Sequence, residues 1–299
     1  MKIYDCFQFF DEEMLLDLRL NIMDKYVDKF VITEATYSHN GKPKKLIFDM
    51  NNFSKFKDKI IYIVVDKQPP DLFEIYETDK DEKDTRGQKL VLNGYKRDNY
   101  QRQMANKTLE GLDSDDWIII NDIDEIPNLD KIDLRNANNK LILFKQKVFY
   151  YKFNLLYPSV YWYGSKACKR KNFISSQWLR NIRQKKYPIW RFDTFFSKKK
   201  YTNVFVVSNG GWHFTNIKSP EEIEKKLLNY THHYEFELSG IKLDDLRKIV
   251  NEKKIIYDLT QDQKGYKWGS NTKLSAVDLS EMPDYLKNNY KKYNNWLDT

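Results

Sequence analysis

The chain has 299 residues, of which 41% are hydrophobic, and it carries a net charge of +8 at pH 7. This length fits one large α/β domain with a real core. Its two cysteines, Cys6 and Cys168, lie outside any CxxC motif, which excludes a disulfide framework and a cysteine-based zinc site and favours a reducing compartment. Acidic residues are interleaved with the basic ones, so the charge favours an anionic partner such as a nucleotide diphosphate over nucleic acid.

Apolar runs in the chain are short. The longest, Ile60–Val65, falls far below the roughly 20 residues that a membrane-spanning helix needs. Acids interrupt the N-terminal segment before the apolar region of a signal peptide could form. We therefore expect no transmembrane segment and a soluble, cytoplasmic protein.

Hydrophobic periodicity predicts the elements of the chain. In chain order they are a helix over 11–26, strands over 30–33 and 60–65, a loop or flap over 66–86, a helix over 95–112, strands over 117–120 and 141–151, an irregular aromatic and basic segment over 152–200, a strand over 201–208, and helices over 219–230, 242–252 and 283–296. The helix at 219 has a strong start signal, because Ser219 and Glu222 form a capping box around Pro220. The alternation predicts an α/β fold with a Rossmann-type, mostly parallel sheet flanked by helices, in which ligands bind at the carboxyl ends of strands.

An acidic turn follows the expected strand at 117–120. It reads Asn121-Asp122-Ile123-Asp124-Glu125-Ile126-Pro127. Two carboxylates at i and i+2 after a strand can both reach one hard cation such as Mg²⁺ or Mn²⁺, which often takes phosphate oxygens as its other ligands. Acids directly after a buried strand are costly unless they bind something or face solvent. The turn therefore predicts a divalent metal site, and the alternative is a solvated turn in which an Asp caps the next element.

Further motifs occur in order over nearly the whole chain. They are Ile3-Tyr4-Asp5-Cys6-Phe7, Val31-Ile32-Thr33-Glu34, Gly41-Lys42-Pro43-Lys44, Tyr100-Gln101-Arg102, and Gly210-Gly211-Trp212-His213-Phe214 followed by Lys226-Leu227 and His232. Together with the acidic turn, this set resembles glycosyltransferase family 17. The best-known members are the β-1,4-mannosyl-glycoprotein N-acetylglucosaminyltransferases, which add the bisecting GlcNAc to N-glycans.

The resemblance implies a GT-A-like fold, a UDP-sugar donor that is typically UDP-GlcNAc, a Mn²⁺-type metal and inversion at the anomeric carbon. We expect a GT-A-like catalytic domain over residues 1–235 and a helical C-terminal extension over 236–299 packed on the same domain. Animal members carry a membrane anchor and a luminal stem, which we do not find here. We therefore expect a bacterial or viral origin and a bacterial or viral glycan as acceptor.

The resemblance also assigns roles in the acidic turn. Asp122 and Asp124 match the family's DxD motif and are expected to hold the metal and the diphosphate of the donor. The metal would neutralise the leaving UDP. Glu125 is expected to orient the donor sugar or a metal ligand.

A late histidine is the expected third metal ligand, because many GT-A enzymes use one. His213 is our candidate, and the alternative for it is a core histidine paired with a backbone carbonyl. His232 is the rival candidate, and His39 and His233 have less support. The Gly210-Gly211 pair before His213 would let the backbone approach a ligand closely.

The nucleoside is expected at the end of the first strand, where GT-A folds hold it. Thr33 and Glu34 would then hydrogen-bond uracil or ribose, and the alternative for Glu34 is a helix cap or a salt-bridged acid. Lys42, in the turn after this strand, would meet the diphosphate.

Two arginines precede the acidic turn. Arg97 and Arg102 are expected to pair with Asp124 or with phosphate, which the guanidinium group can bind through two hydrogen bonds. A solvated helix face is the alternative for Arg97.

An inverting transfer needs a base that takes the proton of the acceptor hydroxyl. In GT-A enzymes the base usually lies between the DxD motif and the late histidine, and Asp193 is the one carboxylate of the segment 135–219. Asp193 is therefore predicted as the base by elimination, and the alternative is an Asp paired with Arg191. The candidates for stacking on acceptor sugars, with core packing as their alternative, are Trp162, Trp178, Trp190 and Trp212.

Other classes of protein fit the same residues. A metal-dependent phosphoryl-transfer enzyme or nuclease would use paired acids and a basic surface, but it would need further acids for a second metal. A carbohydrate-binding module without activity would need neither the acidic turn nor His213. A pseudo-enzyme that binds UDP and transfers nothing is the remaining alternative.

Overall fold

The computed structural model describes residues 1–76, 79, 85–185, 197–198, 200–258 and 268–298. Its helices and strands are, in chain order, β1 (Ile3–Phe9), α1 (Glu13–Met23), β2 (Lys29–Ala35), β3 (Ile60–Val65), α2 (Thr85–Gln103), α3 (Asn106–Glu110), β4 (Trp117–Ile120), β5 (Glu125–Pro127), β6 (Leu141–Phe144), β7 (Gln146–Tyr150), β8 (Leu155–Trp162), β9 (Lys166–Lys169), α4 (Ser176–Arg180), β10 (Val204–Val207), β11 (Gly211–Thr215), α5 (Pro220–Asn229), α6 (His233–Ser239), α7 (Leu243–Asn251), β12 (Ser275–Ala276) and α8 (Asp284–Asn288). The strands predicted at 60–65 and 117–120 are confirmed as β3 and β4. The predicted capping box of Ser219 with Glu222 opens α5.

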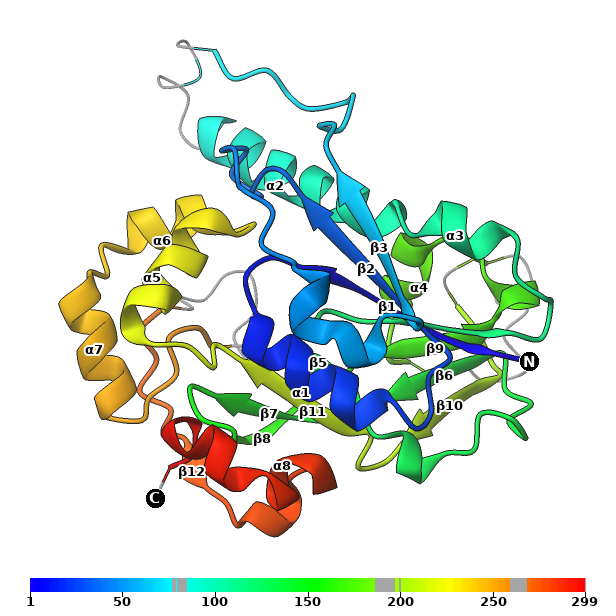
Figure 1. The fold of residues 1–299 in the computed structure, drawn as a ribbon. Helices are drawn as coiled ribbons and strands as arrows, with labels where there is room; N and C mark the ends of the chain where they lie inside the picture. Colours follow the sequence, from blue (N-terminus) through cyan, green and yellow to red (C-terminus); the bar gives the residue numbers. More distant parts are fainter. Residues whose placement is uncertain (77–78, 80–84, 186–196, 199, 259–267, 299) are drawn as a thin grey trace.

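A seven-stranded sheet forms the centre of the fold, in the order β10-β6-β9-β4-β1-β2-β3 (Figure 1). All of its strands run in one direction except β9, which lies antiparallel between β4 and β6. Apolar side chains of α1 pack on one face of this sheet, and Leu109 of α3 and Leu179 of α4 pack on the other. This arrangement confirms the predicted α/β fold, and it brings the carboxyl ends of β1 and β4 to the same edge.

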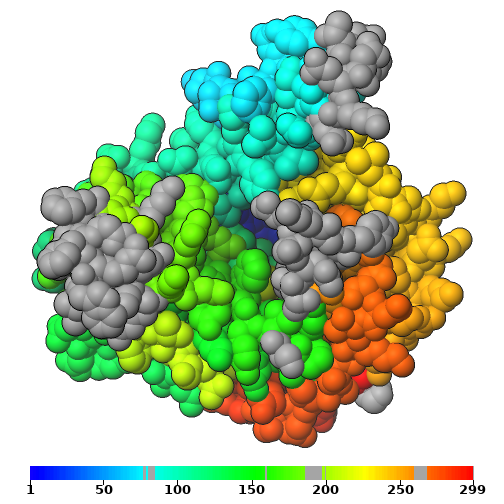
Figure 2. Space-filling model, turned by 180° about the vertical axis from the view of Figure 1, so that it is seen from behind, coloured from blue at the N-terminus to red at the C-terminus, as the bar shows by residue number. Residues whose placement is uncertain are grey.

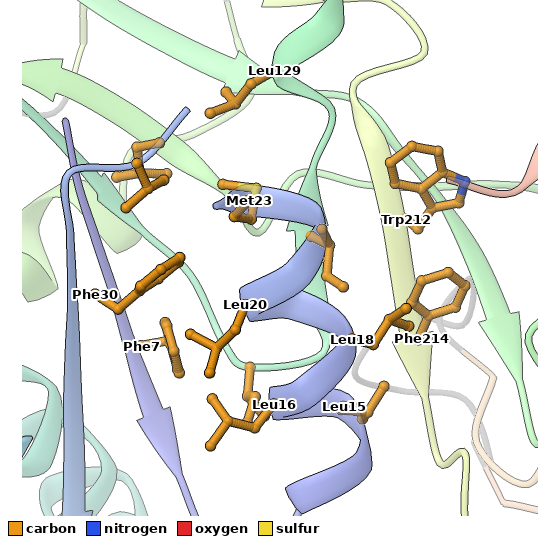
Figure 3. Close-up of a cluster of buried hydrophobic side chains, with 14 of the residues drawn as sticks. Phe7, Leu15, Leu16, Leu18, Leu20, Met23, Phe30, Leu129, Trp212 and Phe214 are labelled. Atoms are coloured by element: carbon orange, nitrogen blue, oxygen red, sulfur yellow. The ribbon is translucent and has the colours of Figure 1, made fainter. Parts of the chain in front are cut away.

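Helix α1 packs between the two sheets of the molecule. Figure 3 shows Leu16 and Leu20 beside Phe7 of the large sheet, and Leu18 beside Phe214 of the second sheet. Apolar residues at helical spacing cover both sides of this short helix, which is why it folds as predicted. Full burial of each leucine contributes about 1.5–3 kcal/mol.

A second sheet of five strands, in the order β12-β8-β7-β11-β5, was not predicted. The segment expected as one strand over 141–151 breaks at Lys145 into β6 and β7, which belong to different sheets. The segment expected to be irregular over 152–200 contains β8, β9 and α4. Periodicity missed this sheet because β5 and β12 have only three and two residues and because β11 pairs with β5 and β7, which lie far away in the sequence.

The C-terminal part packs on the rest of the fold through several elements. Helix α5 contacts both α6 and α7, α8 contacts α1, and β12 extends the second sheet beside β8. The boundary expected after residue 235 falls inside α6, so the division of the chain into a domain and an extension stays a prediction. Over the described ranges, no helix is both long enough and apolar enough to span a membrane.

Candidate active site

The acidic turn joins the two sheets. It begins after Ile120, the last residue of β4, which lies beside Cys6 of β1 in the large sheet. Its last acid, Glu125, opens β5 and pairs with His213 of β11 in the second sheet. The backbone N–H of Phe214 also donates to the carbonyl of Asp124 at 2.8 Å. The second sheet therefore brings the late histidine to the turn, as the sequence hypothesis requires.

A cavity of about 550 Å³ opens above the turn. Figure 2 shows this face hollowed between α2 (cyan) and the α5–α6 region (yellow), with N-terminal residues (blue) at the base. The polar groups of the turn and its surroundings that line the cavity are Asp122, Asp124, Glu125, His213 and Lys226. Its aromatic lining residues are Phe9, Phe10, Tyr95, Tyr150, Trp162, Tyr230 and Tyr257. Carboxylates and aromatic rings that face one concave surface can bind a charged nucleotide together with a sugar.

Asp124 and His213 form a pair at the base of the cavity. The Nε2 atom of His213 lies 3.6 Å from Asp124 Oδ1, and Lys226 Nζ lies 3.8 Å from Oδ2. Burial alone would raise the pKa of Asp124, but its interaction with the His213 ring and the charge of Lys226 outweigh this effect and hold the pKa of Asp124 below its usual value. The His213 ring stacks on Trp162 with centroids 5.2 Å apart. Its buried Nδ1 has no hydrogen-bond partner, which argues against the core histidine with a carbonyl partner.

Two arginines neutralise the other carboxylates of the turn. Arg180 donates to Asp122 at 2.5 Å and to Glu125 at 2.6 and 2.8 Å, and Arg102 donates to Asp122 at 2.9 Å. Although burial opposes ionisation, these guanidinium groups hold the pKa of Asp122 well below its usual value. Glu125 is fully buried, and it also accepts a hydrogen bond from the indole of Trp162.

A buried ion pair, Arg19 with Asp5, binds the backbone of the acidic turn. Arg19 of α1 binds Asp5 of β1 through two hydrogen bonds of 2.7 and 2.8 Å. The same guanidinium donates to the carbonyl oxygens of Asp122, Ile123 and Glu125 at 2.7–3.2 Å. Both charged side chains are completely buried. The backbone of the turn is therefore held by a cation fixed inside the core.

Comparison with known protein families decides the class of the site. A sequence model described as glycosyltransferase family 17 matches residues 1–298. The chain belongs to glycosyltransferase family 17. A comparison with curated proteins gave no match. The chain is accordingly a glycosyltransferase, and such an enzyme uses a nucleotide-sugar donor and a glycan acceptor.

Sequence reasoning about this family 17 glycosyltransferase missed two arginines. Arg180 lies in α4, inside the segment expected to be irregular, and no sequence signal marks it. Arg19 does carry a signal, since it sits among the apolar positions of α1, where a charge needs a buried partner. The structure also shows Gly164 packed against Glu125, because a Cβ atom at Gly164 would lie 1.9 Å from Glu125 Oε1. Only glycine allows the Glu125 carboxylate to lie so close to the backbone.

One detail of the sequence hypothesis needs correction, and another gains a structural explanation. Arg102 pairs with Asp98 and Asp122, and not with Asp124. The glycines before His213 serve backbone packing: a Cβ at Gly211 would lie 2.1 Å from the carbonyl oxygen of Ile126. They allow β11 to approach β5 closely, and an approach to a ligand stays a prediction.

Three residues that were predicted to bind the nucleoside or the phosphates, Thr33, Lys42 and Arg97, do not line the cavity. Thr33 is buried, and its hydroxyl has no hydrogen-bond partner. Lys42 is exposed, and its backbone closes the loop by hydrogen bonds with Ser38 and Asn40. Arg97 donates to Gln68 and to the carbonyl of His39, and so it holds two loops together.

Glu34 is fully buried at the end of β2. Its carboxylate accepts hydrogen bonds from Lys44, Tyr62 and the backbone N–H groups of Ile47 and Phe48. These partners fit the alternative of a salt-bridged acid, since they account for the buried charge and tie the 44–48 segment to the sheet.

Replacement of Glu34 by Gln distinguishes a structural role of this carboxylate from a role in nucleoside binding. We expect a loss of about 1–3 kcal/mol in the free energy of unfolding, because a buried charged hydrogen-bond acceptor is lost, with UDP binding unchanged in the folded variant. Urea titration and calorimetry measure the two quantities, and Glu110→Gln on the exposed end of α3 is the control. Loss of UDP binding by a stably folded Glu34→Gln protein would instead assign this carboxylate to the nucleoside.

The other candidate residues are dispersed. Asp193 and Trp190 lie outside the described residues. Trp178 packs against Tyr201, and Trp212 donates its indole N–H to a backbone carbonyl outside the cavity. Trp162 is the candidate tryptophan that lines the cavity.

The side chains of the acidic turn and of His213 supply some, but not all, of the ligands that a divalent ion needs. Within the described ranges, no group of three or more His, Cys, Asp or Glu side chains could hold a metal. Asp122 faces arginines, so Asp124 and His213 are the two side chains that fit as ligands. A cation that binds a diphosphate commonly takes one or two protein ligands and completes its shell with phosphate and water oxygens. The pair is therefore compatible with an ion that arrives with the donor.

Lys166 fixes the position of Arg180 through hydrogen bonds to the backbone at the end of α4. Its ammonium group donates to the carbonyl oxygens of Arg180, the last residue of α4, and of Ile182, which follows the helix. Burial, followed by the nearby charge of Arg180, lowers the pKa of Lys166 to about 7. The unfolded chain therefore binds more protons than the folded chain between pH 7 and pH 10.5, and the stability that depends on Lys166 rises with pH in this window.

A Lys166→Met variant tests this shift. We expect the unfolding free energy of the wild type to gain about 2 kcal/mol relative to the variant between pH 7 and 9. Urea unfolding at both pH values gives the difference. Equal pH dependence of the two proteins would contradict the lowered pKa.

Proposed function

We propose that this glycosyltransferase transfers GlcNAc from UDP-GlcNAc to a hydroxyl group of a glycan, with inversion at the anomeric carbon and with help from Mn²⁺ or Mg²⁺. The observation that carries the proposal is the Asp124–His213 pair at the base of an aromatic-lined cavity, beside the carboxyl ends of β1 and β4. A GT-A-like arrangement agrees with this position.

The charges around the acidic turn suggest how a donor would bind. A bound divalent ion would act as a Lewis acid on the leaving diphosphate. Asp124 and His213 would hold that ion, and Lys226 beside Asp124 would add positive charge for the phosphates. Arg102 and Arg180 hold the carboxylates of Asp122 and Glu125 in place through ion pairs, so the turn does not have to reorganise on binding.

The aromatic side of the cavity suggests where the sugars would lie. Trp162 donates its indole N–H to the buried Glu125 carboxylate and stacks on the His213 ring. Its indole therefore presents a flat apolar face next to the proposed diphosphate site. Aromatic faces of this kind stack on sugar rings. We assign this position to the donor sugar, with Glu125 fixing the indole that orients it.

Several finer assignments stay predictions. Nucleoside binding by Thr33 and Glu34, contacts of Lys42 and Arg97 with the diphosphate, and Asp193 as the base are among them. The bacterial or viral nature of the acceptor and of the protein, and its cytoplasmic location, are others.

A panel of UDP-sugars, assayed for binding and for UDP release with and without Mn²⁺, tests the proposal. We expect Mn²⁺-dependent binding and turnover, with UDP-GlcNAc as the preferred donor. The family assignment disfavours a phosphoryl-transfer enzyme or a nuclease. Binding of UDP without release of UDP from any UDP-sugar would establish the pseudo-enzyme, and binding of no UDP-sugar would contradict the proposal altogether.

A further inference from the structure

A tyrosine, a histidine and a glutamate form a chain of hydrogen bonds on the wall of the cavity where α2 contacts α6. The hydroxyl of Tyr95, from α2, lies 2.8 Å from Nε2 of His232. Nδ1 of His232 lies 2.9 Å from Oε1 of Glu235 in the first turn of α6. Tyr95 and His232 line the same cavity as Asp124 and His213.

The two hydrogen bonds define which nitrogen can accept a proton. Glu235 accepts from Nδ1, so the proton of the neutral imidazole sits on Nδ1 and the lone pair sits on Nε2. Burial, followed by the negative charge of Glu235, raises the pKa of Tyr95, so its hydroxyl keeps its proton and donates it to Nε2. An imidazole oriented by a carboxylate, with its other nitrogen facing a hydroxyl, is the arrangement by which hydrolases activate a nucleophile.

The His232 side chain is partly exposed to the cavity and is not a buried core residue. Its side chain is 24% exposed and that of Glu235 is 41% exposed, whereas the adjacent His233 is buried and bound to the carbonyl of Tyr230. The titratable groups that contact the His232 ring come from several elements: Tyr95, Glu235, Tyr230 and Tyr257.

The surroundings of His232 also suit a sugar. The rings of Tyr95, Tyr230 and Tyr257 lie with their centroids 5.4–6.3 Å from that of His232, and all line the cavity. Tyrosine rings offer flat apolar faces together with hydroxyl groups, which is the combination that binds a sugar ring and its hydroxyls. A sugar held by these rings would present a hydroxyl to Nε2.

We propose that His232 is the catalytic base of the transfer and that Glu235 is its positioning residue, an inference that rests on the proposed function. The acceptor hydroxyl replaces the Tyr95 hydroxyl at Nε2. As its oxygen forms the bond to the anomeric carbon, the bond from that carbon to the diphosphate oxygen breaks, and its electron pair leaves with UDP. The acceptor proton passes to Nε2, and Glu235 stabilises the imidazolium that forms.

This assignment competes with Asp193, which was chosen by elimination inside the window 135–219. That window assumed that the base precedes the late histidine in the sequence. The fold removes this assumption, because α5 and α6 follow His213 in the chain and still line the cavity with Lys226 and His232.

The decisive variant is His232→Gln, which keeps a hydrogen-bonding group near Nε2 but cannot take up a proton. We measure release of UDP from UDP-GlcNAc with Mn²⁺, first with water alone and then with octyl glycosides of mannose, glucose and galactose as acceptors. We expect kcat to fall by about 10²–10⁴-fold. Calorimetric binding of UDP should be unchanged, and the acidic limb of the kcat/KM profile against pH should disappear.

Glu235→Gln tests the positioning role. The substitution removes the carboxylate that orients the imidazole through Nδ1 and stabilises the imidazolium, so kcat should fall, but less than in His232→Gln, while KM stays unchanged. Glu237→Gln, at an exposed position of the same helix, is the matched control and should behave like the wild type. If His232→Gln does not fold, His232→Asn, which retains a partner for Glu235, replaces it.

The outcomes separate this inference from the proposed function. A wild type that releases UDP from UDP-GlcNAc, with a His232 variant that retains its rate and its acidic limb, overturns the base assignment alone. Loss of the acidic limb in Asp193→Asn but not in His232→Gln would give the role to Asp193. A wild type that neither binds UDP nor releases it from any UDP-sugar overturns both proposals.

Discussion

Replacement of Asp124 by Asn is expected to lower kcat/KM for UDP-GlcNAc by about 10³-fold or more. The substitution keeps the shape of the side chain but removes the carboxylate that faces His213 and Lys226. Because the pKa of Asp124 is held below its usual value, this carboxylate is ionised throughout the neutral range, and no increase in pH restores the charge in the variant. Steady-state kinetics at several Mn²⁺ concentrations measures the effect.

The control for this variant is Asp115→Asn. Asp115 is an exposed acid paired with Lys169 and Lys171 on the surface, so its removal changes the charge by the same amount without touching the cavity. It should leave turnover unchanged. Equal turnover by the Asp124 variant and the wild type, at low as well as at high Mn²⁺, would show that Asp124 is not a ligand of an essential ion.

Replacement of Arg19 by Leu is expected to reduce the free energy of unfolding by about 3–5 kcal/mol. The buried Asp5 carboxylate would lose its cation, and the carbonyl oxygens of Asp122, Ile123 and Glu125 would lose their donor. Urea unfolding gives the stability change. Arg135→Gln, at an exposed loop position, is the control and should have almost no effect.

A double variant separates the charge from the positioning of the turn. In Arg19→Leu with Asp5→Leu no uncompensated charge remains, so we expect much of the stability to return, as is common when a buried pair is replaced as a whole. Activity should not return, because the carbonyl oxygens of the turn still lack their donor. Full recovery of turnover in the double variant would show that Arg19 does not position the turn.

The sequence predicted those parts of the site that depend on local patterns. The strand before the acidic turn was predicted correctly because its residues, Trp117–Ile120, are all apolar and all buried. The start of α5 was predicted because a capping box is a short-range signal. The approach of His213 to Asp124 was expected from the resemblance, but the sheet that brings them together was not.

The parts that could not be predicted depend on contacts between distant segments. The break at Lys145 sends β6 and β7 into different sheets, and no local signal marks it. Arg180 reaches Asp122 and Glu125 across 55 or more positions in the sequence. Glu34 was predicted as a ligand-binding residue because it ends a strand, whereas its partners lie in a loop that folds back over it.

The most direct test of the account is the position of a Mn²⁺ ion in crystals grown with UDP. Anomalous scattering identifies the metal independently of any assumption about its ligands. We predict a peak between Asp124 Oδ1 and His213 Nε2, with the diphosphate on the cavity side of the ion and Asp122 still bound to Arg102 and Arg180. A structure with UDP bound elsewhere, or with Mn²⁺ away from both Asp124 and His213, would contradict the assignment of the acidic turn as the donor site.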